Sequence, residues 1–170
     1  MSLRLTPVEV TALLEDGRRE IDQLVRDLSD ADAKRRGTIG GGDWSVKDLL
    51  GHIAHWEELA LETLRRARTD GTLSRVVLGD VDAENAKDVE RKADWSIEKV
   101  RRESAATHDD LVQSIRETSV EDWTRSRPLE QGGEGALGDM LGSVLGAPDR
   151  PFGHVWAHLQ DLKNYVSSLR

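Results

Sequence analysis

The sequence predicts an all-α protein that folds as a four-helix bundle, and three observations support this fold class. Apolar residues recur at spacings of three and four along most of the chain, which is the period of amphipathic helices. Strict alternation of apolar and polar residues over six or more positions, which would indicate strands, does not occur. The length of 170 residues fits one domain, 1–170, since a typical domain holds about 150 residues. Four long amphipathic helices in one domain bury their apolar faces by packing together.

The first helix is expected at about 7–33. Thr6 and Glu9 have the spacing of a capping box, and Pro7 stands at the first helical position, where a proline is well tolerated. The apolar stripe that follows contains Val10, Leu13, Leu14, Ile21, Leu24, Val25 and Leu28. A glycine-rich connection at 37–42 separates this helix from the next one.

The second helix is expected at about 46–69, with Ser45 as its N-terminal cap. Its stripe contains Val46, Leu49, Leu50, Ile53, Trp56, Ala60 and Leu64. A loop at 71–80 follows and includes a short apolar piece at 75–78.

The third helix is expected at about 82–118, with a break near Trp95 where Ser96 can cap a new run. The triplet Asp-Trp-Ser/Thr occurs here at 94–96, and also at 43–45 and 122–124. We interpret the triplet as a reused capping device rather than as a sign of internal repeats.

A long irregular connection is expected at 126–150, because this stretch holds six glycines and two prolines. Within it, 137–145 has the composition of a short helix. Pro151 is expected to open the final helix. The stripe of that helix contains Phe152, Val155, Trp156, Leu159, Leu162, Val166 and Leu169.

Composition excludes several classes of function. The 24 Lys and Arg against 32 Asp and Glu give a formal charge of -8, which repels phosphate backbones and anionic lipids, so no nucleic acid and no membrane is expected as a partner. No run of eighteen apolar residues occurs, and we expect a cytoplasmic protein. Zero cysteines exclude disulfides, thiolate metal sites and cysteine nucleophiles. Any metal must therefore be held by His, Asp or Glu.

Three of the five histidines are candidate metal ligands. His154 and His158 lie one turn apart on the final helix, so both imidazoles can reach one divalent ion. His52 lies about 100° around the second helix from Ile53, at the edge of the apolar stripe. Together they can form a three-nitrogen site with open positions, which suits zinc or nickel and leaves iron or manganese open. The alternative is a surface pair that has helical spacing by chance.

The other two histidines are interpreted differently. His55 is expected to face solvent among glutamates. His108 lies on the apolar side of its run, where it is either a core histidine with satisfied hydrogen bonds or a residue of a substrate pocket.

Two tryptophans close to the candidate ligands are further candidates for substrate binding. Trp56 lies one turn after His52, and Trp156 stands between His154 and His158. An indole ring offers a large apolar surface that can line a substrate pocket, although plain core packing explains either residue alone. The candidate substrate-binding set is therefore Trp56, Trp156 and His108.

Two segments of the chain resemble the DinB/YfiT-like superfamily. Residues 44–57, Trp-Ser-Val-Lys-Asp-Leu-Leu-Gly-His-Ile-Ala-His-Trp-Glu, are similar to its helix-two signature, and residues 152–162 are similar to its final helix. The middle stretches 81–86 and 94–100 are similar to the ClbS/DfsB-like branch. The resemblance implies a bundle of up-down-down-up topology with a divalent ion held by one histidine of helix two and two of the last helix. On this sequence these are His52, His154 and His158.

The resemblance also implies a metal-dependent enzyme acting on small molecules. Members include transferases that use a low-molecular-weight thiol cosubstrate such as mycothiol or bacillithiol, a maleylpyruvate isomerase, and self-protection proteins that hydrolyse a reactive compound. Leu159-Gln160 follows His158, where some thiol transferases continue His-Arg-Gly-Gln. Because the chain has no cysteine, a thiol would have to be a diffusing cosubstrate.

Two other interpretations of the sequence stay open. One is a metal-free bundle of ClbS/DfsB type that binds a toxic ligand and so protects the cell. The other is a structural oligomeric bundle. A homodimer is compatible with each of these interpretations.

Overall fold

The computed structural model describes residues 4–40, 42–74 and 79–170. Its helices are α1 (Pro7–Val25), α2 (Asp30–Lys34), α3 (Val46–Asp70), α4 (Val81–Arg91), α5 (Ile97–Arg116), α6 (Val120–Thr124), α7 (Leu137–Val144) and α8 (His154–Ser168). Two short strands, β1 (Ser126–Pro128) and β2 (Glu134–Ala136), form an antiparallel hairpin. The apolar piece noted at 75–78 lies outside the described residues.

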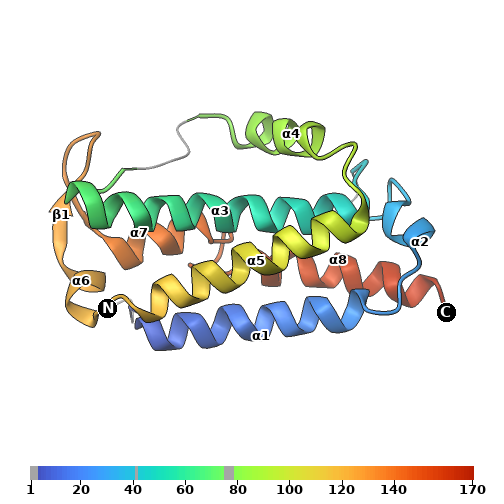
Figure 1. Cartoon of the computed structure of the whole chain (residues 1–170), viewed down its shortest axis with the longest axis horizontal. Coiled ribbons are helices and arrows are strands. Elements are labelled where there is room, and N and C mark those ends of the chain that lie inside the picture. Colours follow the sequence, from blue (N-terminus) through green and yellow to red (C-terminus); the bar gives the residue numbers. More distant parts are fainter. Residues whose placement is uncertain (1–3, 41, 75–78) are drawn as a thin grey trace.

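Helices α1, α3, α5 and α8 lie side by side and make the bundle (Figure 1). Helices α3 and α5 run in the same direction. Lys47, at the start of α3, donates to the carbonyl of Ala93 at 2.8 Å, and Arg68, near its end, donates to the carbonyl of Ser114 at 2.7 Å. Helices α1 and α8 run the opposite way, so the topology is up-down-down-up and the expected fold class is confirmed.

The expectation of one continuous helix over 7–33 is wrong. Helix α1 ends at Val25, and the short helix α2 begins at Asp30. Ser29 explains the new start, because its hydroxyl accepts a hydrogen bond from the backbone N–H of Asp32 at 3.1 Å and so caps α2. The expected break near Trp95 is confirmed, since α4 and α5 are separate helices.

Helix α4 lies outside the bundle, along α3 (Figure 1). A buried polar group docks it there: the Lys92 ammonium donates to the carbonyl of Gly51 at 2.6 Å and to Asp88 at 2.8 Å. His55 Nε2 lies 3.1 Å from Glu84, so α4 covers His55. The expectation that His55 faces solvent is therefore wrong, because α4 returns over α3.

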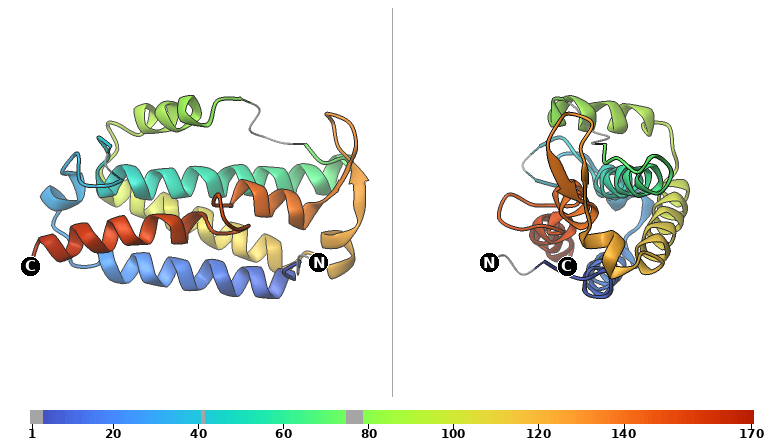
Figure 2. Two further views of the ribbon diagram at one scale, coloured as in Figure 1. Left: turned by 180° about the vertical axis from the view of Figure 1, so that it is seen from behind. Right: turned by 90° about the vertical axis from the view of Figure 1, so that its left-hand side faces the viewer.

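The fourth helix position of the bundle is divided between two helices, α7 and α8. Helices α7 and α8 follow each other along the long axis, and residues 145–153 separate them (Figure 2). The short helix expected near 137–145 is confirmed as α7. The final helix begins at His154 and not at Pro151, because Phe152 has a φ of 55°, which no right-handed helix accommodates. The hairpin of β1 and β2 was not expected, since three-residue strands are too short to produce a periodic pattern.

Two buried clusters fill the interior. One is rich in leucine, with Leu64, Leu111 and Leu141 at its centre, and the other contains Ile53 and Leu162. Phe152 belongs to the first cluster and Val155 to the second, so the start of α8 lies where the two clusters meet. None of the helices in the described ranges combines the length and the apolar character that a membrane span requires.

The close contact between α7 and Trp123 predicts a position that tolerates no side chain. A Cβ added at Gly138 would overlap the indole of Trp123, which is 2% exposed. We expect Gly138→Ala to lower the free energy of unfolding by about 1–3 kcal/mol, measured by chemical denaturation. Gly42→Ala is the control, because a Cβ there meets nothing within 4 Å and should change stability by less than about 0.5 kcal/mol. Equal stability of both variants would contradict the packing described.

Candidate metal centre

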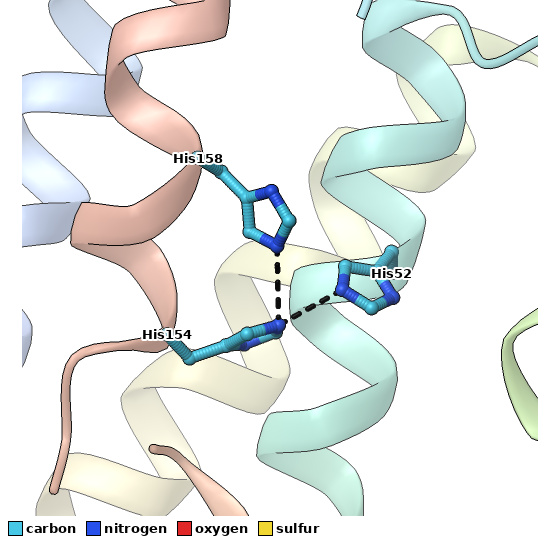
Figure 3. A group of neighbouring side chains, drawn as sticks. All are labelled: His52, His154 and His158. Atoms are coloured by element: carbon cyan, nitrogen blue, oxygen red, sulfur yellow. Dashed lines mark hydrogen bonds between the residues drawn. The ribbon is translucent and has the colours of Figure 1, made fainter. Parts of the chain in front are cut away.

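Three histidine side chains from two helices converge between α3 and α8 (Figure 3). His154 Nε2 lies 2.8 Å from His52 Nε2 and 3.3 Å from His158 Nε2. The potential ligand atoms of all three lie within 4.8 Å of one another. The structure thus brings together the three residues that helical spacing selected.

Helices α3 and α8 position these imidazole rings in different ways. His52 sits within α3, held by helical hydrogen bonds on both sides, and it is 5% exposed. His154 is the first residue of α8, and its backbone N–H donates to the carbonyl of Leu145 at 3.0 Å. His158 follows one turn later on the same face. The rings meet edge to face, with interplanar angles of 67° for His52 and His154 and 82° for His154 and His158, so nitrogens point inward rather than rings stacking.

Burial keeps these imidazoles neutral. Burial first, and then the charges of the neighbouring histidines, lower the pKa of His52 to about 2. Burial and then the charge of His158 lower the pKa of His154 to about 3. The pKa of His158 is also lowered by burial, and nearby Asp161 opposes the shift. All three side chains therefore offer nitrogen lone pairs at neutral pH.

The three imidazole nitrogens are better suited to binding a divalent cation than to hydrogen bonding with one another. A neutral imidazole has one N–H, and His154 Nε2 faces two other Nε2 atoms, so hydrogen bonds cannot satisfy all three nitrogens. Within the described chain, Nδ1 of His52 and of His154 are buried without a partner. Nitrogens that bind one zinc at about 2.0 Å in tetrahedral geometry lie about 3.3 Å apart. The observed separations of 2.8 and 3.3 Å are close to that spacing.

Two tryptophans lie against the histidine cluster. The ring centroid of Trp56 is 6.3 Å from that of His52 and 6.0 Å from that of His154. Trp56 Nε1 donates to the side-chain oxygen of Asn85 on α4 at 3.0 Å, which fixes the indole. The ring of Trp44 lies 4.8 Å from that of His52. Sequence reasoning missed Trp44, although it stands in the Asp-Trp-Ser triplet that caps α3.

The other two candidate substrate residues lie elsewhere. Trp156 packs against α1, where its Nε1 is 3.5 Å from the Cβ position of Gly17. His108 lies between α3 and α5, with Nδ1 2.9 Å from Glu57 Oε1 and both side chains buried. His108 is 5% exposed, and it does not lie beside the three clustered histidines. Glu57 was not singled out in the sequence, because a buried glutamate on a helix has no distinguishing pattern.

The family model of the DinB superfamily matches residues 13–146. The match includes His52 and ends before His154. A search of the curated proteins found no match.

Several solved structures share the fold. YfiT from Bacillus subtilis, described as a probable metal-dependent hydrolase with an unusual four-helix bundle topology, has a TM-score of 0.68 and 15% identity over 96% of this chain and 87% of its own. The mycothiol-dependent maleylpyruvate isomerase has a TM-score of 0.69 and 18% identity over 93% of this chain, which spans only 61% of that enzyme. At these identities the likeness concerns the fold alone.

A third similar structure corrects an expectation. ClbS, a colibactin self-resistance protein, was crystallised in complex with double-stranded DNA and has a TM-score of 0.69 and 15% identity over 99% of this chain and 95% of its own. The expectation that nucleic acid is excluded as a partner is therefore wrong for this fold. It rested on the net charge of -8, and net charge does not describe how charge is distributed over a surface.

Burial of the histidine cluster predicts that the metal-free protein loses stability in acid. Folding lowers the pKa of all three histidines, so below about pH 6.5 the unfolded chain binds protons that the folded cluster does not. The free energy of unfolding should fall with decreasing pH, by up to about 1.4 kcal/mol per pH unit for each histidine. Denaturant unfolding between about pH 7 and 4.5 should give a shallower slope for His52→Phe than for the wild type. Identical pH dependences of the free energy of unfolding in the two proteins would show that the histidine cluster is not buried and neutral.

The pair of His108 and Glu57 predicts a different response. His108→Leu should cost about 3–5 kcal/mol, because it leaves the Glu57 carboxylate buried without a partner. The double variant Glu57→Leu/His108→Leu should recover much of that loss, since no buried charge remains. Chemical denaturation of the three proteins measures this, and a single variant as stable as the wild type would show that the pair is not a buried charged contact.

Proposed function

The chain belongs to the DinB superfamily, and we propose that it is a metal-dependent enzyme that adds a small nucleophile to a reactive small molecule. The nucleophile is water, which makes the reaction a hydrolysis, or a low-molecular-weight thiol such as mycothiol, which makes it an S-transfer. The observation that carries this proposal is the convergence of three neutral imidazoles within ligand distance of one another.

His52, His154 and His158 would hold the cation. Three nitrogen donors favour zinc or nickel over magnesium or calcium, which prefer oxygen. When bound by three neutral ligands, such an ion would supply Lewis acidity that brings the pKa of water or of a thiol near neutrality. This chemistry serves hydrolysis and thiol transfer alike.

Side chains around the cluster supply the rest of the site. Trp56 and Trp44 present apolar surface beside His52, which favours an apolar substrate and limits the access of water. Asn85 holds the Trp56 indole in place. His154 and His158 keep part of their surface exposed, so a small molecule can approach from α8. A thiol must arrive as a cosubstrate, because the chain contains no cysteine.

A second candidate function is a metal-free protein that binds a reactive compound and so protects the cell. Its support is the likeness to ClbS, a colibactin self-resistance protein, and to DfsB, which has a TM-score of 0.63 and 14% identity. The two candidates differ in whether the histidine cluster needs a cation.

Turnover of the zinc-loaded protein, prepared without a histidine tag, separates the two functions. An epoxide and an aryl halide are offered with water alone and with mycothiol, and loss of each is followed by mass spectrometry. We expect turnover that a chelator abolishes and that His158→Ala reduces by about 100-fold or more. His55→Gln, which changes a histidine on α3 outside the cluster, is the matched control and should retain turnover. Electrophile binding that is stoichiometric and insensitive to chelator would support the second function and contradict the first.

A further inference from the structure

The turn that leads into α8 holds a strained residue. Phe152 has a φ of 55°, in the left-handed region that is unfavourable for a residue with a Cβ. Such strain persists only where surrounding contacts fix the conformation, and it often lies next to a functional residue. Here the residue two positions later is His154.

Contacts from two other elements hold Phe152 in this conformation. Its ring stacks on Trp123 of α6 with a centroid separation of 6.1 Å and an interplanar angle of 17°. Its backbone N–H donates to the carbonyl of Gly142 of α7 at 3.2 Å. Trp123 is itself fixed, because its Nε1 donates to the carbonyl of Leu5 at 2.9 Å. Phe152 is 4% exposed and is thus clamped from α6 and α7.

The clamp decides where α8 begins. The sequence pattern favours a helix from Pro151, yet the left-handed residue delays the helix until His154. Gly153 follows with φ -90° and ψ 0°, and a Cβ there would collide with Arg150, so this turn is closely packed as well. His154, the first helical residue, therefore takes its position from the turn, whereas His158 takes its position from the helix.

We propose that Phe152 is a positioning residue for the histidine cluster: it contributes no ligand atom and sets the placement of His154 Nε2 relative to His52. The inference rests on the proposed metal function, because only a metal centre makes the placement of that nitrogen consequential. The proposal also assigns a role to the Asp-Trp-Thr triplet at 122–124, to which the proposed function gives none. By stacking on Trp123, the ring of Phe152 connects that triplet to the turn that precedes His154.

Cobalt binding to purified protein without a histidine tag tests this role. Phe152→Leu keeps an apolar side chain and removes the stacked ring, whereas Phe152→Tyr keeps the ring. Tyr165→Leu is the matched control, since Tyr165 is a buried aromatic residue of α8, 7% exposed, about two turns beyond His158. Its hydroxyl donates to the carbonyl of Asp32 at 2.8 Å. The readouts are the Co²⁺ dissociation constant and the intensity of its visible bands, measured where every variant is folded.

We expect Phe152→Leu to weaken Co²⁺ binding by about 10-fold or more and to change the visible bands, as loss of a group that orients a ligand does. Phe152→Tyr and Tyr165→Leu should bind as the wild type does, although Tyr165→Leu is less stable. Wild-type affinity and bands in Phe152→Leu would overturn the proposal. Should Phe152→Leu not fold, Gly142→Ala replaces it: its Cβ would lie 3.0 Å from the Phe152 ring and push the ring aside. Unchanged Co²⁺ binding in Gly142→Ala would then overturn the proposal.

A wild-type protein that binds no Co²⁺ would contradict the proposed metal function. The positioning role of Phe152 is then tested on the metal-free protein. The His154 and His52 Nε2 atoms are 2.8 Å apart, so a ¹⁵N–¹⁵N coupling across that hydrogen bond reports their placement by NMR. We expect the coupling in the wild type and in Tyr165→Leu, and its loss in Phe152→Leu. A coupling that persists in Phe152→Leu would show that Phe152 does not position His154.

Discussion

The interior of this bundle depends on one constraint, which is that three imidazoles buried against one another must stay unprotonated. Each neutral imidazole of His52, His154 and His158 has one N–H, so hydrogen bonds cannot satisfy all of their facing nitrogens, and burial lowers the pKa of all three. Taking these polar rings out of water costs free energy, which the leucine-rich and isoleucine-containing clusters on either side offset. A structure that tolerates such an arrangement has its nitrogen lone pairs ready for a cation.

Two departures from a regular four-helix bundle lie around this cluster. The fourth helix position is broken between α7 and α8, and the break places His154 at the start of a helix in the middle of the bundle. Helix α4 leaves the bundle and returns over α3, where Asn85 holds Trp56 beside the histidines. The break between α7 and α8 thus adds His154 to the cluster, and the return of α4 adds Asn85 beside it. A continuous helix would have directed either side chain elsewhere.

The features that could be predicted from the sequence are those set by neighbouring residues, such as helix ends and helical spacing. The sequence predicts helix α3 to within a residue of its ends, because Ser45 and Asp48 form a capping box and Gly71 ends the helix in a left-handed conformation. The three candidate ligands followed from helical spacing. Features that depend on contacts between distant parts of the chain were not predictable. His55 is covered because Lys92 docks α4 on the Gly51 carbonyl of α3, and α8 starts late because Trp123 holds Phe152.

The central claim is that the Nε2 atoms of these three histidines bind one divalent cation. X-ray absorption spectroscopy of zinc-loaded protein without a histidine tag, with one zinc per chain, tests it most directly. The account predicts a first coordination sphere with three imidazole nitrogens at about 2.0 Å and a fourth ligand from water. A coordination sphere of oxygens alone, or the same spectrum in a His52→Phe variant, would contradict it.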